Sequence, residues 1–325
     1  MTVTCAWCDA PKQSSLVCPQ CGADYAKAEA IKSKGKAESV LTSSLENTLD
    51  SSVDGASDTF LEDTDSLIPV KDPAFEKTVC LFALPGMLCF ALFVQVTGFL
   101  SGMQRIFFAM PIHELGHAVS GWLCGFNSIP TLWKTLTPEN RGYFSSVLLI
   151  IGLFMLARYG LRNKKPAWLA AVLSILLVQA YGTLVMSPSK ADMYIVMGGD
   201  AMGLILATIL MSLFYVGKQT QLYKGSLRWG FLGIGAAAFM NMYIPWWKKD
   251  MSAIGYGLTG GIPTDSWKMI NIHLWQWNDL FNLHITLGMI CLVSLTAIYA
   301  LGLRQANNWV KEKARLDRLA RIRND

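Results

Sequence analysis

Two histidines and a glutamate lie within five residues of one another in the stretch MPIHELGHAVSGW, residues 110–122. On a helix, His113 and His117 are four residues apart and therefore point to the same face. Two imidazoles at this spacing can bind one zinc ion. Glu114 lies beside them, where a carboxylate can take a proton from a water molecule that the metal activates. The pattern predicts a catalytic zinc site with His113 and His117 as ligands and Glu114 as general base.

The chain that carries this motif has the composition of a membrane protein. Of its 325 residues, 52% are hydrophobic and only 16% are charged, whereas soluble domains carry about 25% charged residues. Several apolar segments approach or exceed the ~18 residues that a bilayer-spanning helix needs. The candidate spans are 78–104, 106–125, 143–160, 167–186, 194–216, 229–247 and 281–303. We therefore expect an all-α polytopic membrane protein with about six to seven transmembrane helices.

Ionisable residues inside a membrane-spanning segment cost free energy, so their presence indicates a function by default. The alternative to a functional site is a polar group that is buried for helix packing. HELGHAVSG also resembles the site-2 protease family of intramembrane zinc metalloproteases. The resemblance is specific at residues 113–117 and extends in architecture over about 105–215. It implies cleavage of substrates within or beside the bilayer, with the two histidines as ligands, the glutamate as base and an aspartate from a later span as third ligand.

Asp200, in IVMGGDAMGLILATIL, is the best match to that third ligand. It is the one carboxylate inside its predicted span, and its depth of about 9 Å is compatible with about 12 Å for His113. The match departs from the family, because Ala201 follows the aspartate where the family has glycine and no convincing Asn–Pro companion is present. His273 is the first alternative ligand, and the further rivals are Asp265, Asp279 and, more weakly, His284.

A second metal site is predicted at the N-terminus, in CAWCDAPKQSSLVCPQCGADY. Two C-x-x-C pairs separated by nine residues can hold a structural zinc ion in a short ribbon, whose ligands would be Cys5, Cys8, Cys18 and Cys21. Two disulfides are the alternative, but a segment without a signal peptide stays in a reducing compartment. The expected organisation is a zinc ribbon (1–26), a flexible linker (27–72) rich in Ser, Asp, Thr and Glu, a multi-pass membrane domain (73–304) and a basic C-terminal tail helix (305–325).

Basic clusters at span ends indicate the cytoplasmic side. The C-terminal cluster, from Arg304 to Arg323, suits either an anionic leaflet surface or a solvated helical tail. We expect the ribbon and the tail to be cytoplasmic, but three candidate spans precede the cluster that begins at Arg158. Either the N-terminus lies outside, or one of these spans does not cross fully. The segment that contains HELGH is the least hydrophobic of the three.

The leading functional hypothesis is a membrane-embedded zinc metalloprotease with one catalytic and one structural zinc ion. Its partners would be the lipid bilayer, a membrane protein or peptide substrate, and a protein that the ribbon recruits. The alternative is a non-proteolytic membrane protein with structural zinc sites, acting as a scaffold or handling zinc. Nucleic-acid binding is not expected, because residues 1–30 carry no dense basic patch.

Overall fold

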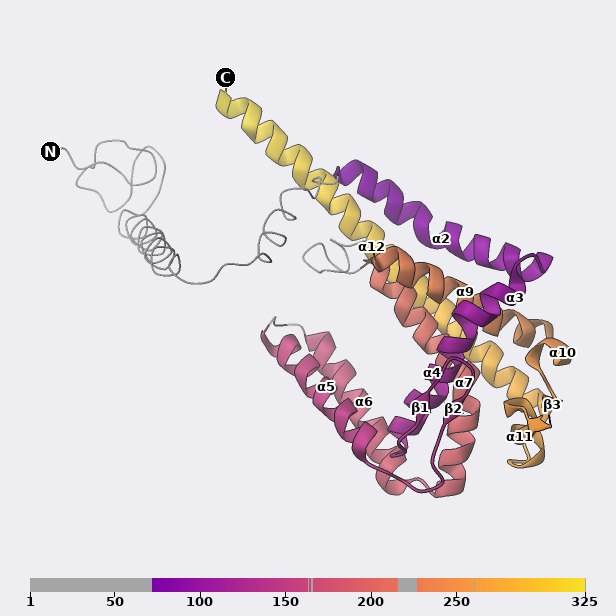
Figure 1. Cartoon of the computed structure of the whole chain (residues 1–325). Coiled ribbons are helices and arrows are strands. Elements are labelled where there is room, and N and C mark those ends of the chain that lie inside the picture. Colours follow the sequence, from indigo (N-terminus) through magenta and orange to yellow (C-terminus); the bar gives the residue numbers. More distant parts are fainter. Residues whose placement is uncertain (1–71, 163, 165, 216–226, 260, 325) are drawn as a thin grey trace, which may run out of the picture. The chain divides into compact units, whose positions relative to one another are not determined.

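The computed structural model describes residues 72–162, 164, 166–215, 227–259 and 261–324 (Figure 1). The predicted zinc ribbon, its four cysteines and nearly all of the predicted linker lie outside these residues, so both stay predictions.

The seven apolar segments are mainly helical in the part of the chain that is described, but the first of them, 78–104, is broken between Thr97 and Ser101. In chain order the helices are α2 (Pro73–Thr97), α3 (Ser101–Gln104), the π-helical turn η1 (Arg105–Ala109), α4 (Met110–Leu123), α5 (Phe144–Arg162), α6 (Pro166–Ala180), the π-helical turn η2 (Tyr181–Val185), α7 (Pro188–Ser212), the 3-10 turn η3 (Leu213–Tyr215), α9 (Leu227–Lys248), α10 (Met251–Ile254), α11 (Asp265–Asn271) and α12 (Trp277–Asn324). The HELGH motif lies in α4.

Two short antiparallel hairpins were not part of the all-α expectation. One pairs β1 (Ile129–Pro130) with β2 (Thr135–Leu136), and the other pairs β3 (Leu258–Thr259) with β4 (Ile262–Pro263). Strands of two residues are too short to show the alternating pattern by which a strand is recognised in a sequence.

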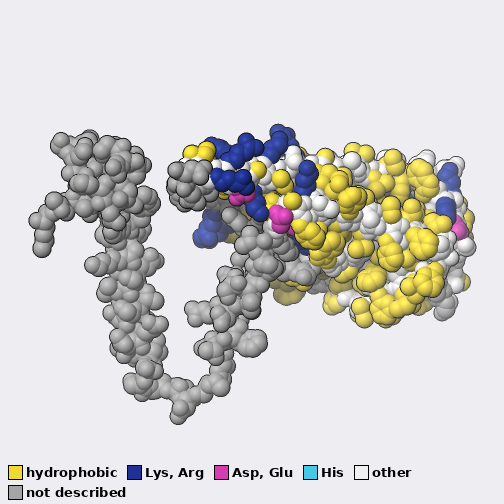
Figure 2. Space-filling model, turned by 90° about the horizontal axis from the view of Figure 1, so that it is seen from above, with side chains coloured by type: hydrophobic (Ala, Val, Ile, Leu, Met, Phe, Trp, Pro, Cys, Tyr) yellow, Lys and Arg dark blue, Asp and Glu magenta, His cyan; other side chains and the backbone are white. Residues whose placement is uncertain are grey.

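Five helical segments in the described part of the chain are long and apolar enough to cross a membrane: Pro73–Thr97, Phe144–Arg162, Pro166–Val185, Pro188–Tyr215 and Trp277–Leu319. Their outer surfaces are largely apolar, and most Lys and Arg side chains visible in Figure 2 gather toward one end. The predicted spans 106–125 and 229–247, which became α4 and α9, are not among the five. The basic residues expected as a tail helix at 305–325 form the last part of α12, which is continuous with the final span.

Helix ends follow the local sequence. The side chain of Asp72 accepts a hydrogen bond from the N–H of Ala74, Pro73 opens α2, and Gly98 ends the helix with φ of +74°. At the start of α7, the hydroxyl of Ser187 accepts from the N–H of Lys190. These caps fix where α2 and α7 begin.

The closest helix packing is between α4 and α7, and it depends on glycine. A Cβ at Gly116 of the HELGH motif would lie 2.7 Å from the carbonyl oxygen of Gly199 on α7. Larger side chains from α7, α9 and their neighbours then fill the main core, which includes Leu204, Met211, Phe214 and Phe239. Glycine at position 116 therefore lets the motif helix lie directly on the backbone of α7.

A buried ion pair joins α2 to α9 in this core. The two guanidinium nitrogens Nη1 and Nη2 of Arg228 lie 2.5 and 3.1 Å from the carboxylate oxygens of Glu76. Both side chains are almost fully buried, and the guanidinium lies 4.8 Å from the ring centroid of Phe214. The pair neutralises its own charge within the apolar core.

Candidate metal centre

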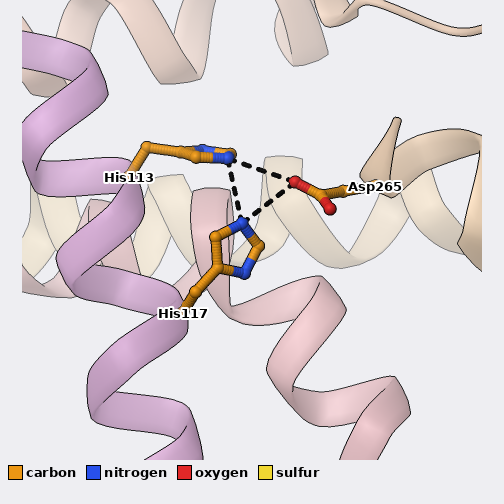
Figure 3. A group of neighbouring side chains, drawn as sticks. All are labelled: His113, His117 and Asp265. Carbon is orange, nitrogen blue, oxygen red and sulfur yellow. Dashed lines mark hydrogen bonds and ion pairs between the residues drawn. The ribbon is translucent and has the colours of Figure 1, made fainter. Parts of the chain in front are cut away.

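Three side chains converge beside the N-terminal half of α4 (Figure 3). Nε2 of His113 and Nε2 of His117 lie 3.1 Å apart. Oδ2 of Asp265, the first residue of α11, lies 3.2 Å from the first of these nitrogens and 3.0 Å from the second. The three atoms thus form a nearly equilateral triangle that links α4 to a segment about 150 residues later in the chain.

Helix α7 determines which ring nitrogens face this triangle. Nδ1 of His117 lies 2.6 Å from the backbone carbonyl oxygen of Ile195, and Nδ1 of His113 lies 2.8 Å from Oδ1 of Asp200. A carbonyl and a carboxylate only accept hydrogen bonds, so both Nδ1 atoms carry the hydrogen. This assignment follows from the partners. In a neutral imidazole the Nε2 atom then has a free lone pair, and both lone pairs face Asp265.

The triangle has the chemistry and the size of a zinc site. Three lone-pair donors cannot face one another at 3.0–3.2 Å without a proton or a metal ion between them. Ligand atoms about 2.0–2.1 Å from a zinc ion, at the tetrahedral angle, lie about 3.3 Å apart. The residues present therefore fit a tetrahedral metal ion, with one position left for a further ligand.

Asp200, the ligand expected from the sequence, lies on the opposite side of His113. Its Oδ1 accepts from Nδ1 of His113, and its Oδ2 accepts from the indole Nε1 of Trp246, 2.8 Å away. The metal-type group in the described residues contains Asp265 in its place. The carboxylate that the sequence singled out thus contacts His113 and lies outside the triangle.

The other candidates also lie outside the triangle. Nε2 of His273, the first alternative, is 3.2 Å from Oδ2 of Asp192. Asp279 is exposed in the first turn of α12. His284 is buried, and its ring stacks on Trp246 with centroids 3.9 Å apart and the planes 7° from parallel.

The general base of the prediction, Glu114, faces the same cavity as the triangle. This cavity has a volume of about 1080 Å³ and is lined by residues of α4, α7, α9, α11 and both hairpins. The hydroxyl oxygen of Thr135, on β2, lies 2.8 Å from Oε2 of Glu114 and 2.7 Å from its backbone carbonyl oxygen. The β1–β2 hairpin therefore holds the carboxylate in a fixed place.

The start of α11 presents Asp265 in its ionised form. Burial acts to raise the pKa of this carboxyl, but the charge of His117 and the hydrogen bonds with both histidines outweigh burial, so the pKa is well below its usual range. Lys268, one helical turn later, places its Nζ 3.7 Å from Oδ1. An ionised carboxylate is the form that binds a metal.

Glycine also provides the room for the two imidazoles. A Cβ at Gly199 would lie 2.5 Å from Nε2 of His117 and would also strike the ring of His113. The GGD sequence of α7 thus supplies space for the histidines at Gly199 and a hydrogen-bond acceptor at Asp200.

Sequence reasoning missed Thr135 and Trp246 as parts of this centre. Thr135 lies 21 residues after Glu114 in a hairpin with no recognisable strand pattern. Trp246 lies at the end of the predicted span 229–247 and carries no motif of its own. A buried tryptophan requires an acceptor for its N–H, but which acceptor it finds depends on the packing of α9 against α7.

Comparisons with protein-family models, with curated proteins and with solved structures find no match to this chain. The geometry of the centre is therefore the basis for assigning a function.

Proposed function

We propose that this chain is a membrane-embedded zinc metalloprotease that hydrolyses peptide bonds of membrane-associated proteins. His113, His117 and Asp265 hold the zinc ion, and Glu114 is the general base. The observation that carries the proposal is the triangle of three lone-pair atoms with sides of 3.0–3.2 Å, which matches the ligand spacing of tetrahedral zinc.

Each residue has a distinct part in hydrolysis. A zinc ion at this centre supplies a Lewis acid that polarises a carbonyl and makes water more acidic. Glu114 accepts the proton of the attacking water at its carboxylate and passes it to the leaving amine. Thr135 keeps that carboxylate in place through its hydroxyl. The large cavity next to the triangle gives room for a stretch of polypeptide.

The alternative is a structural zinc site in a scaffold or zinc-handling protein. A structural site closes its coordination sphere with four protein ligands, whereas a catalytic site keeps one position open. The group in the described residues contributes three ligand residues beside a cavity that Glu114 also lines. This arrangement favours the catalytic reading.

The test uses the full-length chain purified in detergent, with zinc measured by elemental analysis. We expect two zinc ions per chain, one of them lost when the four ribbon cysteines are changed to serine. His113→Ala should remove the other. Glu114→Gln should retain both ions. It should cleave a quenched-fluorescent peptide library at least a hundredfold more slowly, which is the effect expected when a general base is removed.

Two results would overturn the proposal. One is a His113→Ala variant that keeps the full zinc content. The other is a Glu114→Gln variant that cleaves the library as fast as the unchanged chain. An inactive wild-type protein with full zinc content would support the structural alternative.

A further inference from the structure

Behind the ligand triangle lies a second, polar layer that the proposed catalysis does not use. Asp200 accepts from two donors at once, Nδ1–H of His113 at 2.8 Å and Nε1–H of Trp246 at 2.8 Å. The ring of Trp246 is in turn stacked on the buried ring of His284. The layer therefore runs from α12 through α9 and α7 to a histidine of α4.

We infer that Asp200 is a positioning residue, which orients His113 for zinc through a hydrogen bond shared with Trp246. The inference rests on the proposed zinc site and deepens it. It assigns to Asp200 a role in metal affinity that differs from the ligand role expected from the sequence.

The two oxygens of Asp200 explain why a carboxylate is needed here. Its two neighbours are both donors, because an indole N–H only donates and Nδ1 of His113 must carry the hydrogen if the lone pair of Nε2 is to bind zinc. A carboxylate offers one acceptor to each. An asparagine offers one acceptor and one NH₂ group, so one of the two donors would face another donor.

His117 shows that the requirement is specific to one ligand. Its Nδ1 is held by the backbone carbonyl of Ile195, which no side-chain substitution removes. His113 depends on a side chain for the same function. Loss of Asp200 therefore frees the ring of His113 to rotate and leaves the ring of His117 in place. Removing such a partner of a metal-binding histidine typically weakens metal affinity about 10–100-fold.

The test measures zinc affinity by competition with a chromophoric chelator. It uses the full-length chain with the four ribbon cysteines changed to serine, so that one site is titrated. Asp200→Ala should bind zinc about 10–100-fold more weakly, and Asp265→Ala should lose binding entirely. Asp192→Asn is the matched control, because this exposed carboxylate lies on the same helix and lines the same cavity but pairs with His273. It should leave the affinity unchanged.

A double-variant cycle separates positioning from general damage. Asp200→Asn alone leaves one donor facing the amide NH₂ and should bind zinc about tenfold more weakly. Adding Trp246→Phe removes the competing donor, so the amide oxygen can turn to His113. The double variant should then bind zinc more tightly than Asp200→Asn alone. If both substitutions only damaged the structure, their losses of zinc affinity would add, and the double variant would bind more weakly.

Three outcomes contradict the inference. Additive losses in the cycle would show that Asp200 acts through packing alone. Unchanged zinc affinity in Asp200→Ala would show that it has no part in the site. Complete loss in Asp200→Ala with full binding in Asp265→Ala would make Asp200 the ligand. Failure of the proposed proteolysis is distinguishable from all three, because it leaves the pattern of zinc affinities intact and removes only peptide cleavage.

Discussion

In the described part of the chain, two of the clusters of ionisable groups between helices differ in what their members need. Between α2 and α9, the guanidinium of Arg228 faces the carboxylate of Glu76 with two close nitrogen–oxygen contacts. Between α4, α7 and α11, the Nε2 atoms of two histidines face the carboxylate of Asp265. The first cluster pairs one cation with one anion, whereas the second brings three ligand-type atoms together around a position that a proton or a metal ion can occupy.

The difference separates a structural use of buried charge from a functional one. Burying an ionic group is tolerated when a partner satisfies it. Glu76 has such a partner in Arg228, so this pair needs nothing from outside the chain. The atoms of the histidine triangle need a proton or a metal ion between them. A group of converging ligand atoms is therefore a better candidate for a functional site than a buried ion pair.

The largest effect on folding is expected from breaking the balanced cluster. Glu76→Ala leaves the guanidinium of Arg228 buried without its carboxylate, which should lower the free energy of unfolding by about 3–5 kcal/mol. Thermal unfolding in detergent measures the loss, and zinc affinity at the triangle should not change.

The double variant Glu76→Leu/Arg228→Met is the control for this prediction. It replaces both charges with apolar groups of similar size and should recover most of the lost stability. If the single variant is as stable as the unchanged protein, the pair does not have the structural role given to it here.

A smaller effect, confined to the proposed metal site, is expected from Gly199→Ala. The added Cβ would lie 2.5 Å from Nε2 of His117, so zinc affinity should fall on the order of tenfold or more. Alanine favours a helix more than glycine does, so α7 itself should not be weakened.

Gly152→Ala on α5 is the matched control, because nothing lies within 4 Å of the Cβ it would add. It should leave zinc affinity as it is. Chelator competition compares the two variants, and equal affinities would mean that the imidazoles can move away from a methyl group at no cost.

The smallest effect is expected where a carboxylate is exposed. The hydroxyl of Ser252 and the N–H of Ala253 donate to Asp250 at the start of α10 and hold its pKa below the ordinary value. A lowered pKa stabilises the fold above the pKa of the unfolded chain, about 3.9, and this contribution disappears as the pH falls through the folded pKa.

Asp250→Asn keeps the cap and removes the charge. Its melting temperature should therefore lie slightly below that of the unchanged protein at pH 6, and the two should converge as the pH falls below about 4. If the difference between the two melting temperatures stays constant down to pH 3, the charge of Asp250 is not its cause.

Much of the helical framework could be predicted from the sequence, because long apolar segments have few alternatives to a helix. His113, Glu114 and His117 could be predicted to share one site, because helical spacing is local. Asp200 was predicted as the third ligand; the structure gives its carboxylate two hydrogen-bond donors and places it outside the triangle. The sequence around Asp200 does not distinguish a carboxylate that accepts hydrogen bonds from one that binds a metal ion.

The role of Asp265 could not be derived in the same way. It ends the Gly-rich stretch GYGLTGGIPTD, and its approach to α4 depends on how α11 packs against α7. Such long-range contacts leave no periodic pattern in the chain. The π-helical turn η1 directly before α4 is equally invisible to an analysis based on a 3.6-residue repeat.

The last helix also has a mechanical consequence. α12 contains 48 residues without a break, which corresponds to a rod of about 72 Å, more than twice the ~30 Å thickness of the hydrocarbon layer. His284, which stacks on Trp246, lies near its first end, and the basic residues from Lys311 onward lie near the other. Rotation of this rod about its axis turns both ends through the same angle. A tilt of about 5° displaces one end relative to the other by about 6 Å.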